Sequence, residues 1–366
     1  MARNSSKQNI AASHAPFLAG ILFLVILGAG VYALNFSNLF SVEYGEANVA
    51  TTTPIQALID AVKPVPKLDK DAYDKKLIEV SNVASTSATS TRLLWGPKPH
   101  VYPNAGAILP FKRIVAYYGN FYSKGMGVLG EYPEDIMLEK LRAEVAHWNE
   151  ADPQTPVMPA IDYIVTTAQG SAGKDGLYRL RMPDSQIDRA LELAHKVNGV
   201  VILDVQIGLS SLERELPVLE KYLSMPEVHL ALDPEFSMKT KAKPGTVIGT
   251  MDAADINYAA EYLATLVREH NLPPKILVIH RFTEDMVTNY KAIRPLPEVQ
   301  MIVDMDGWGF GSKKINTYQQ VVYSEPVQFT GFKLFYKNDL KPPSKRLLTP
   351  AELLKLVPAP LFIQYQ

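Results

Sequence analysis

The sequence contains no cysteine in its 366 residues. This absence excludes disulfide bonds, zinc sites built from thiolates, iron–sulfur clusters and a cysteine nucleophile. The seven histidines are scattered and form neither an HxH nor an HExxH pair, so a histidine-rich metal site is not expected. The sequence therefore predicts no metal-binding residues and no cofactor, with a divalent cation kept only for the metal-dependent alternative below.

A surplus of charge of one sign is also lacking. Lys and Arg number 37 against 38 for Asp and Glu, which gives a formal net charge of -1. A chain without a strong basic field has little general affinity for nucleic acid. Nucleic acid is therefore not an expected partner.

One long hydrophobic run is present, near the N-terminus. Residues 15–36 carry no charged side chain and match the roughly 20 residues that a helix needs to cross a bilayer. Arg3 and Lys7 precede the run, so the positive-inside rule puts residues 1–14 in the cytoplasm and the rest of the chain outside. The alternative is a signal peptide cleaved near Ala33. We predict an uncleaved signal anchor and a single-pass location in the cell membrane, with the following domain extracytoplasmic.

Residues 37–110 are rich in Thr, Ser, Pro and Lys, as in TTTP, KPVPKLDKD and STSATST. A segment of this composition buries too little apolar surface to fold alone, so it is predicted to be a low-complexity linker. Its last part, residues 93–110, regains Leu, Trp and Tyr and is alternatively a lid on the folded domain.

From residue 111 to residue 366, short apolar runs alternate with amphipathic helical patterns, one of them opened by Asp184 as an N-cap. Strand, helix, strand repeated over roughly 250 residues is typical of a (β/α)8 barrel. An open doubly wound sheet is the alternative, but no GxGxxG or P-loop pattern follows any strand. No convincing helix separates the fourth and fifth runs, so a distorted barrel is expected. The eight candidate strands are 113–120, 157–164, 200–207, 228–236, 246–253, 275–282, 299–308 and 331–336.

Three candidate strands carry polar residues on one face only. Side chains two apart in a strand share a face. In the strand at 200–207 the odd-numbered positions are all apolar and suit a helix layer, whereas the even-numbered positions become polar at the C-terminal end. The strands at 228–236 and 299–308 repeat this pattern. The polar residues that are expected to face inward are Asp204, Gln206, Asp233, Glu235, Asp304 and Asp306.

The C-terminal ends of barrel strands converge on one mouth, where barrel enzymes carry their chemistry. The other candidate strands add Asp162, His280 and Lys333 to this mouth. A single strand-end carboxylate often caps the next helix instead, which is the expectation for Asp252. So many like charges are costly to desolvate in one place, so we expect a substrate, a cation or a partner to use the set.

Paired carboxylates at a barrel mouth are typical of glycosidic-bond cleavage, in which one protonated acid serves the leaving oxygen and an ionised carboxylate is nucleophile or base. The strand ends ILDVQIG, LALDPEF, IVDMDGWG and GFKLFY resemble those of uncharacterised exported bacterial TIM-barrel proteins that are distantly similar to glycoside hydrolases. The resemblance covers residues 111–366. In many barrel glycosidases the acid ends the fourth strand and the nucleophile a later one, commonly the seventh. The resemblance thus implies Glu235 as the acid and Asp304 or Asp306 as the nucleophile or base.

Aromatic side chains near the strand ends are candidates for stacking against sugar rings. Lys333 would orient a substrate oxygen or carboxylate, or else neutralise Asp304. His280 would be a second acid or base, or else hydrogen-bond a neighbour. The predicted substrate-binding residues are Tyr118, Asp162, Asp204, Gln206, Asp233, His280, Trp308, Lys333 and Phe335.

The sequence leaves three functions open. The first is a membrane-anchored extracytoplasmic protein, similar to glycoside hydrolases, that acts on envelope or extracellular glycan. Its partners would be carbohydrate, including cell-wall glycan, and the membrane through the N-terminal helix. The second is a non-catalytic barrel that binds glycan or protein. The third is a hydrolase that depends on Mg²⁺ or Ca²⁺, with oxygen ligands from Asp162, Asp204, Asp233, Glu235 and Asp304.

Overall fold

The computed structural model describes residues 67–82 and 101–366, which belong to one compact unit. Within these residues eight parallel strands form a closed barrel, because β1 pairs with β11 on one side and with β2 on the other. The strands follow one another in chain order, and the predicted (β/α)8 barrel is confirmed. They are β1 (Arg113–Gly119), β2 (Val157–Ala168), β4 (Val200–Val205), β5 (Val228–Leu232), β7 (Lys275–Arg281), β9 (Val299–Met305), β10 (Phe329–Leu334) and β11 (Phe362–Tyr365).

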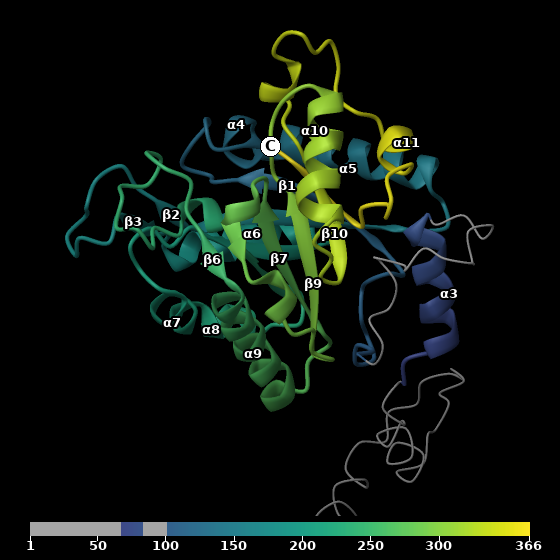
Figure 1. Ribbon diagram of the computed structural model, residues 1–366, viewed down its shortest axis with the longest axis horizontal. Helices are drawn as coiled ribbons and strands as arrows, with labels where there is room; N and C mark the ends of the chain where they lie inside the picture. The colour runs from purple at the N-terminus through teal and green to yellow at the C-terminus, as the bar shows by residue number, and fades with distance from the viewer. Residues whose placement is uncertain (1–66, 83–100) are drawn as a thin grey trace, which may run out of the picture. The chain divides into compact units, whose positions relative to one another are not determined.

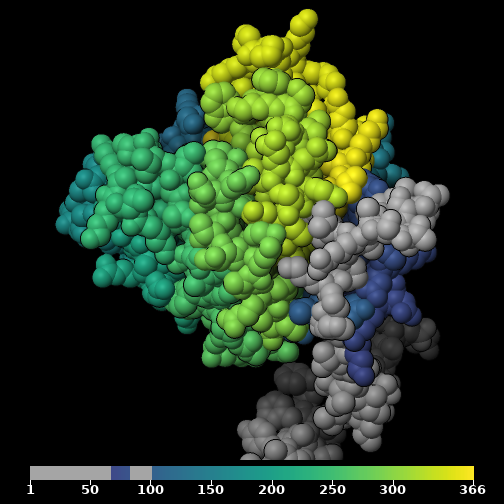
Figure 2. Space-filling model, in the orientation of Figure 1, coloured from purple at the N-terminus to yellow at the C-terminus, as the bar shows by residue number. Residues whose placement is uncertain are grey.

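Helices lie around the outside of these strands (Figure 1). In the space-filling view of the same face, side chains fill the gaps between the ribbons (Figure 2). The helices are α4 (Val128–Glu131), α5 (Glu134–Ala151), α6 (Asp184–His195), α7 (Leu212–Glu215), α8 (Glu220–Leu223), α9 (Ala253–His270), α10 (Gly311–Thr317) and α11 (Pro350–Leu353). Short 3-10 turns are η2 (Pro217–Leu219), η3 (Pro234–Phe236), η4 (Glu284–Met286), η5 (Tyr290–Ala292) and η7 (Asn338–Leu340), and η6 (Tyr318–Tyr323) is a π-helix.

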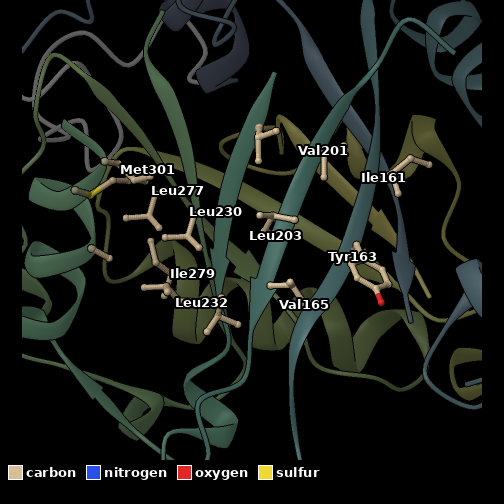
Figure 3. Packing of buried hydrophobic residues seen from close by; sticks show 14 of the residues in the cluster. Ile161, Tyr163, Val165, Val201, Leu203, Leu230, Leu232, Leu277, Ile279 and Met301 are labelled. Atoms are coloured by element: carbon tan, nitrogen blue, oxygen red, sulfur yellow. The ribbon is translucent and has the colours of Figure 1, made fainter. Parts of the chain in front are cut away.

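The outer faces of the strands carry a continuous hydrophobic layer. Pairing between neighbouring strands places one fully buried row in register across five of them: Tyr163, Leu203, Leu230, Leu277 and Met301. Figure 3 shows these side chains within the packed cluster. Each buried side chain of this kind contributes about 1.5–3 kcal/mol. A register slip of one residue would turn the row into the barrel, so this layer fixes the register.

The inner faces are apolar in the lower part of the barrel and polar at the top. Ile202, Ile276 and Ile302 belong to the inner hydrophobic cluster. Asp204 lies two positions after Ile202, and Asp304 lies two positions after Ile302. Both aspartates are buried as well. The predicted alternation is therefore confirmed within β4 and β9, whereas the predicted strand at 228–236 ends at Leu232, so that Asp233 follows it and Glu235 lies in the turn η3.

The predicted strand at 246–253 is wrong. Only Met251–Asp252 forms a strand, β6, and it pairs with β8 (Val287–Thr288) outside the barrel. Turn residues precede it, including Gly245 at a φ of +79°. The strand that completes the barrel is β11, which was not predicted. A further short strand, β3 (Arg179–Arg181), extends β2 in antiparallel pairing.

Helix ends agree with the sequence in part. Asp252 caps α9 as expected, because its side chain accepts a hydrogen bond from the N–H of Ala254 at 3.0 Å. Asp184, predicted as the N-cap of α6, is instead its first residue. The helical pattern at 212–223 is interrupted at Pro217 and becomes α7, η2 and α8, because proline has no N–H to donate.

Residues 70–81, which fall in the segment predicted as a linker, form helix α3 (Lys70–Ser81). Tyr73 packs edge-on against Phe111 with the ring centroids 6.0 Å apart. The carbonyl of Val80 accepts a hydrogen bond from the N–H of Ala359 at 2.9 Å. The helix is therefore joined to the barrel by both apolar and backbone contacts.

The segment before β1 closes the base of the barrel. Leu109 is fully buried in the inner hydrophobic cluster. The side chain of Gln300, on β9, accepts a hydrogen bond from the N–H of Leu109 at 3.1 Å and donates one to its carbonyl at 2.7 Å. A buried loop needs such partners for its backbone groups, so Gln300 allows this segment to enter the barrel.

The predicted single-pass membrane location needs correction. No helix within residues 67–82 and 101–366 is long and apolar enough to cross a bilayer. Residues 15–36, on which that prediction depended, lie outside the described residues. We therefore base no functional argument on a membrane location.

Replacing Gln300 tests the closure of the base. Gln300→Leu keeps a side chain of similar size but leaves the backbone N–H and C=O of Leu109 without partners. An unpaired buried polar group costs about 1–3 kcal/mol, so the free energy of unfolding is expected to fall by about 2 kcal/mol or more. Urea denaturation of the full chain measures this change. The exposed Gln319→Leu is the matched control, and an equal effect of both substitutions would contradict the role of Gln300.

Candidate active site

A buried layer of charged side chains lies inside the barrel below its mouth, with His280 of β7 at its centre. Nε2 of His280 lies 2.9 Å from Oδ2 of Asp204 on β4, and Nδ1 lies 3.2 Å from Oδ2 of Asp304 on β9. None of the three side chains has exposed surface. His280 and Asp304 meet because β7 and β9 place them at paired register positions. One imidazole thus joins carboxyl groups from two other strands.

Asp162 of β2 and Gln364 of β11 complete this lower layer. Nε2 of Gln364 donates a hydrogen bond to Oδ2 of Asp162 at 2.6 Å. Oδ1 of Asp162, like Oδ1 of Asp204 and of Asp304, is buried without a hydrogen-bond partner among the described residues. Burial raises the pKa of Asp162 well above its usual range and raises that of Asp304. The proton-bearing form of both groups is favoured in consequence.

Gly331 of β10 leaves the room that Asp304 occupies. A Cβ atom at position 331 would lie 2.5 Å from Oδ1 of Asp304 and 2.9 Å from the ring of Phe362. Neither neighbour can withdraw easily in a barrel interior that is closely packed. A larger residue here would displace the carboxyl group from the lower layer.

An upper layer, nearer to solvent, contains Asp306 and Lys333. Oδ1 of Asp306 lies 3.0 Å from Nζ of Lys333, and Oδ2 lies 3.4 Å from Nδ1 of His280. The ammonium of Lys333 also lies 3.8 Å from the centroid of the Tyr118 ring, which is a cation–π contact. Asp306 is therefore held between two basic side chains.

Gln206 and Asp233 organise the neighbouring part of the upper layer. Nε2 of Gln206 lies 3.3 Å from both the hydroxyl oxygen of Tyr118 and Oδ2 of Asp233. Oδ1 of Asp233 accepts a hydrogen bond from the N–H of Glu235 at 3.1 Å and so caps the turn η3. This turn places Glu235 at the wall of the mouth.

The mouth opens into a cavity of about 680 Å³. Cavities of this size hold small ligands or part of a longer one. Glu235 and the polar side chains of the upper layer, Tyr118 among them, line it together with the rings of Phe236, Phe282, Trp308 and Phe335. The cavity thus offers both hydrogen-bonding groups and surfaces on which a sugar ring can stack.

Burial raises the pKa of two carboxyl groups at the cavity. For Asp233, burial raises the pKa well above its usual range, and the charge of Asp204 adds to the effect. For Glu235, burial raises the pKa and the charge of Asp306 adds to it, while the charges of Lys333 and His280 oppose the rise. Glu235 therefore retains its proton at a higher pH than an ordinary glutamate does.

Two cations balance the acidic groups. Burial lowers the pKa of His280, but the charge of Asp306 and the hydrogen bonds to Asp204 and Asp304 outweigh burial and raise that pKa well above its usual value. Burial also lowers the pKa of Lys333, and the charge of Asp306 again outweighs it, so this pKa is raised. The cationic form of both side chains is therefore favoured.

The structure brings the predicted site residues into two layers. Those that line the cavity are Tyr118, Gln206, Asp233, Glu235, Asp306, Trp308, Lys333 and Phe335. Those that lie below it, fully buried, are Asp162, Asp204, His280 and Asp304. Of the two candidates for the nucleophile or base, Asp306 thus reaches the cavity and Asp304 does not.

The strand order changes one assignment. Because residues 246–253 do not belong to the barrel, β9 with Asp304 and Asp306 is the sixth strand and not the seventh. The seventh strand is β10, and the residue it brings to the mouth is Lys333. Glu235 does follow the fourth strand, β5. The fourth-strand part of the glycosidase pattern is present, whereas a lysine stands where the pattern has a carboxylate.

Several residues of the site were not predicted. Gln364 was missed because β11 was missed, although the alternation in FIQYQ places Phe362 and Gln364 on one face. Phe282 follows β7 directly and Phe236 ends the turn η3 after β5, so their position near the mouth could have been inferred from the strand ends. Lys313 also lines the cavity, but it lies in α10, where no strand rule applies.

The oxygen ligands of the metal-dependent alternative have other neighbours in the structure. Asp204 and Asp304 bond to His280, and Asp162 bonds to Gln364. Within residues 67–82 and 101–366 no group of three or more His, Asp or Glu side chains is arranged to hold a metal ion. We assign no metal ligands.

Comparison with known proteins identifies no family. No protein-family model matches the chain, and no curated protein matches its sequence. One similar solved structure is a cellulase (14% identity, TM-score 0.34). The match covers 61% of this chain and 65% of the cellulase chain, which is slightly under two thirds. Another is cellulose synthase subunit Z from Clostridioides difficile (9% identity, TM-score 0.35), with 70% of this chain and 91% of that one covered. A third, from a metagenomic library, is a xyloglucan-specific endo-β-1,4-glucanase in complex with cellotriose (11% identity, TM-score 0.33), with 62% and 77% covered.

These likenesses are remote and carry no functional argument. The barrel is established by its own strand pairing. From its strand ends, the sequence resembles exported bacterial proteins that are similar to glycoside hydrolases. The comparisons support only the coarser part of this resemblance, namely structural neighbours of glycoside-hydrolase type at low similarity.

Replacing Asp162 tests whether the buried carboxyl groups of the lower layer reduce the stability of the fold. The raised pKa of Asp162 means that the folded state binds its proton more tightly, so stability is highest below the unfolded pKa and is lost as pH rises toward the folded pKa. Asp162→Asn cannot ionise, and its free energy of unfolding at pH 7 is expected to rise by about 0.5–2 kcal/mol. The free energy of unfolding, measured by urea denaturation at pH 5, 7 and 8, should also decline less with rising pH in this variant than in the parent. The exposed Asp285→Asn is the control, and lower stability of Asp162→Asn at pH 7 would show the layer to be stabilising instead.

Proposed function

We propose that this chain is a carbohydrate-active hydrolase that cleaves a glycosidic bond with Glu235 as the general acid and Asp306 as its carboxylate partner. One observation carries the proposal: a carboxyl group with a raised pKa and a carboxylate held by two cations line the same cavity. Glycosidic-bond cleavage needs one protonated and one ionised carboxyl group at the scissile bond.

Glu235 has the properties of the acid. Among the described residues its side chain has no hydrogen-bond or ion-pair partner, so the carboxyl group is free to meet a substrate oxygen. Burial and the charge of Asp306 keep a proton on it by raising its pKa. In the reaction this proton passes to the leaving oxygen as the bond to the sugar carbon breaks.

Asp306 has the properties of the ionised partner. The ammonium of Lys333 and the imidazolium of His280 each contact one of its oxygens. The carboxylate either forms a bond to the sugar carbon, which water later breaks, or takes a proton from the water that attacks this carbon. In both routes the positive charge that develops on the sugar faces a negative charge.

Lys333 is charged and therefore acts as a positioning group. Lysines that form imines with a carbonyl substrate need a lowered pKa and a free amine. The pKa of Lys333 is raised instead, by the charge of Asp306 acting against burial. We assign Lys333 to holding Asp306 and to orienting an oxygen of the substrate.

A non-catalytic barrel that binds glycan is the second candidate. An ion pair favours this candidate. Asp306 is paired with Lys333, and Lys333 occupies the mouth position of the seventh strand. Arg281, at the end of β7, is a second cation that could close such a mouth, but it donates hydrogen bonds to the carbonyl groups of Thr283, Glu284 and Val287, forms an ion pair with Glu325 and does not line the cavity. The two candidates differ in turnover alone.

Neutralising each carboxyl group tests the assignment of roles. The full chain is incubated with a panel of polysaccharides, and new reducing ends are measured. Glu235→Gln and Asp306→Asn are each expected to lower kcat by about 100-fold or more, because each loses one half of the acid and carboxylate pair. Glu269→Gln, an exposed carboxyl group on α9, is the control and should retain the parent rate. Full activity in either mouth variant would refute the acid and carboxylate roles, and a parent that binds glycan but releases no product would favour the second candidate.

The pH dependence tests the acid independently. Activity is expected to fall as pH rises through the raised pKa of Glu235, because only the protonated form donates. The charge of Lys333 lowers that pKa, so in Lys333→Met the alkaline limb of the kcat/KM profile is expected to move to higher pH while the rate falls. A purely structural role of Lys333 would lower the rate without moving the limb.

A further inference from the structure

One side of the cavity rim carries a surplus of positive charge. Two segments that contribute to the cavity wall, residues 307–317 after β9 with helix α10 and residues 335–349 after β10, contain six basic side chains and one acidic side chain. Three of the six are in ion pairs, namely Lys314, Lys337 and Arg346. The other three have no ion-pair partner within the described part of the chain, namely Lys313, Lys341 and Lys345.

Two of the unpaired lysines lie over an exposed tryptophan. Trp308 lines the cavity and is 50% exposed. Nζ of Lys313 lies 5.4 Å and Nζ of Lys341 lies 4.9 Å from the centroid of its ring. Gly309 permits this arrangement, because its φ is +147° and a Cβ atom there would lie 2.9 Å from Cδ of Lys313. A side chain at position 309 would therefore push Lys313 away from the ring.

A buried ion pair holds the two segments together beneath the rim. Nζ of Lys314 lies 2.6 Å from Oδ2 of Asp339, and both side chains are almost fully buried. The carboxylate of Asp339 also accepts hydrogen bonds from the N–H groups of Gly309 at 2.8 Å and of Phe335 at 2.9 Å. Nζ of Lys314 also donates to the carbonyl of Lys333 at 2.7 Å. The tryptophan and the lysines over it are thus fixed to the strands that carry Asp306 and Lys333.

We propose that Trp308, Lys313 and Lys341 form a subsite for a sugar residue that bears an anionic group, so that the glycan bound at this mouth is acidic. The indole would stack against the sugar ring, and the two ammonium groups would pair with its carboxylate or sulfate. This inference rests on the proposed function and specifies its substrate class.

The contacts favour an anionic sugar over a neutral one. Lysine ammonium groups near the indole interact with its ring face, so a neutral sugar that stacks there must displace them and gives no ion pair in return. A sugar with an anionic group displaces them from the ring face as well, but it binds them through charge-assisted hydrogen bonds. The same lysines offset the repulsion that Asp306 exerts on an acidic ligand.

Calorimetry on the full chain tests the subsite with three probes of equal length. Tetragalacturonate carries carboxylates, a sulfated tetrasaccharide carries sulfates, and cellotetraose is neutral. At least one acidic probe is expected to bind about tenfold more tightly than cellotetraose, a preference that weakens as salt is added. The acidic probe that binds identifies the source of the anionic group. Equal affinity for the neutral probe would overturn the proposal.

Substitutions locate the preference. Lys313→Gln with Lys341→Gln is expected to remove the preference by weakening the binding of the acidic probe, whereas cellotetraose should bind no more weakly than to the parent, because no ammonium group then has to leave the ring. Trp308→Leu should weaken the binding of both the acidic probe and cellotetraose, because both stack on the indole. Lys355→Gln, an exposed lysine on the chain after α11, is the matched control and should retain the preference. A preference that survives in the double lysine variant would refute the subsite, as would equal competition by inorganic sulfate alone, which would indicate an adventitious ion only.

Failure of this inference is distinguishable from failure of the proposed function. Glu235→Gln should lose turnover but retain the preference for the acidic probe. A parent chain with the preference but without turnover would refute the acid and carboxylate roles only. Turnover of neutral glycan without any acidic preference would refute the subsite only.

Discussion

The mouth of this barrel depends on the contacts that one buried side chain, the imidazole of His280, makes with carboxyl groups. The imidazole bonds to Asp204 and Asp304 in the lower layer and lies 3.4 Å from Asp306 in the upper layer. Without this cation, carboxyl groups from neighbouring strands would face one another with only Lys333 to offset their repulsion. His280 and Lys333 each contact one oxygen of Asp306, while the pKa of Glu235 is raised by burial, and the proposed acid and carboxylate roles depend on this difference in surroundings.

The barrel tolerates such an interior because its outer surface is strongly apolar. The buried row that runs from Tyr163 on β2 to Met301 on β9 fixes the strands against the helices, independently of what fills the barrel. Alternation along each strand separates the residues that pack against the helices from those that face the lumen, where the polar groups lie above an apolar floor. The polar layers can therefore be arranged for reactivity at some cost in stability.

Period-two alternation explains how much of this site could be predicted from sequence. It identified the inward carboxyl groups on β4, β5 and β9 because a strand allows only two faces. It could not decide between Asp304 and Asp306, since the depth of a residue below the mouth depends on the stagger of the strands, which involves pairings across the whole barrel. It missed β11 because four residues after a proline-rich segment give too short a pattern. The strand predicted at 246–253, which does not belong to the barrel, misplaced β9 in the strand order.

The plug formed by Leu109 and Gln300 has a consequence for how this protein can be divided. The eight strand and helix units begin at Arg113, yet their lumen is sealed from below by a residue that precedes them. A fragment trimmed to the repeats alone would admit water to the floor of the barrel and leave a buried carboxamide without partners. The smallest autonomous unit is therefore longer than the repeat pattern indicates, and it includes the residues that lead into the first strand.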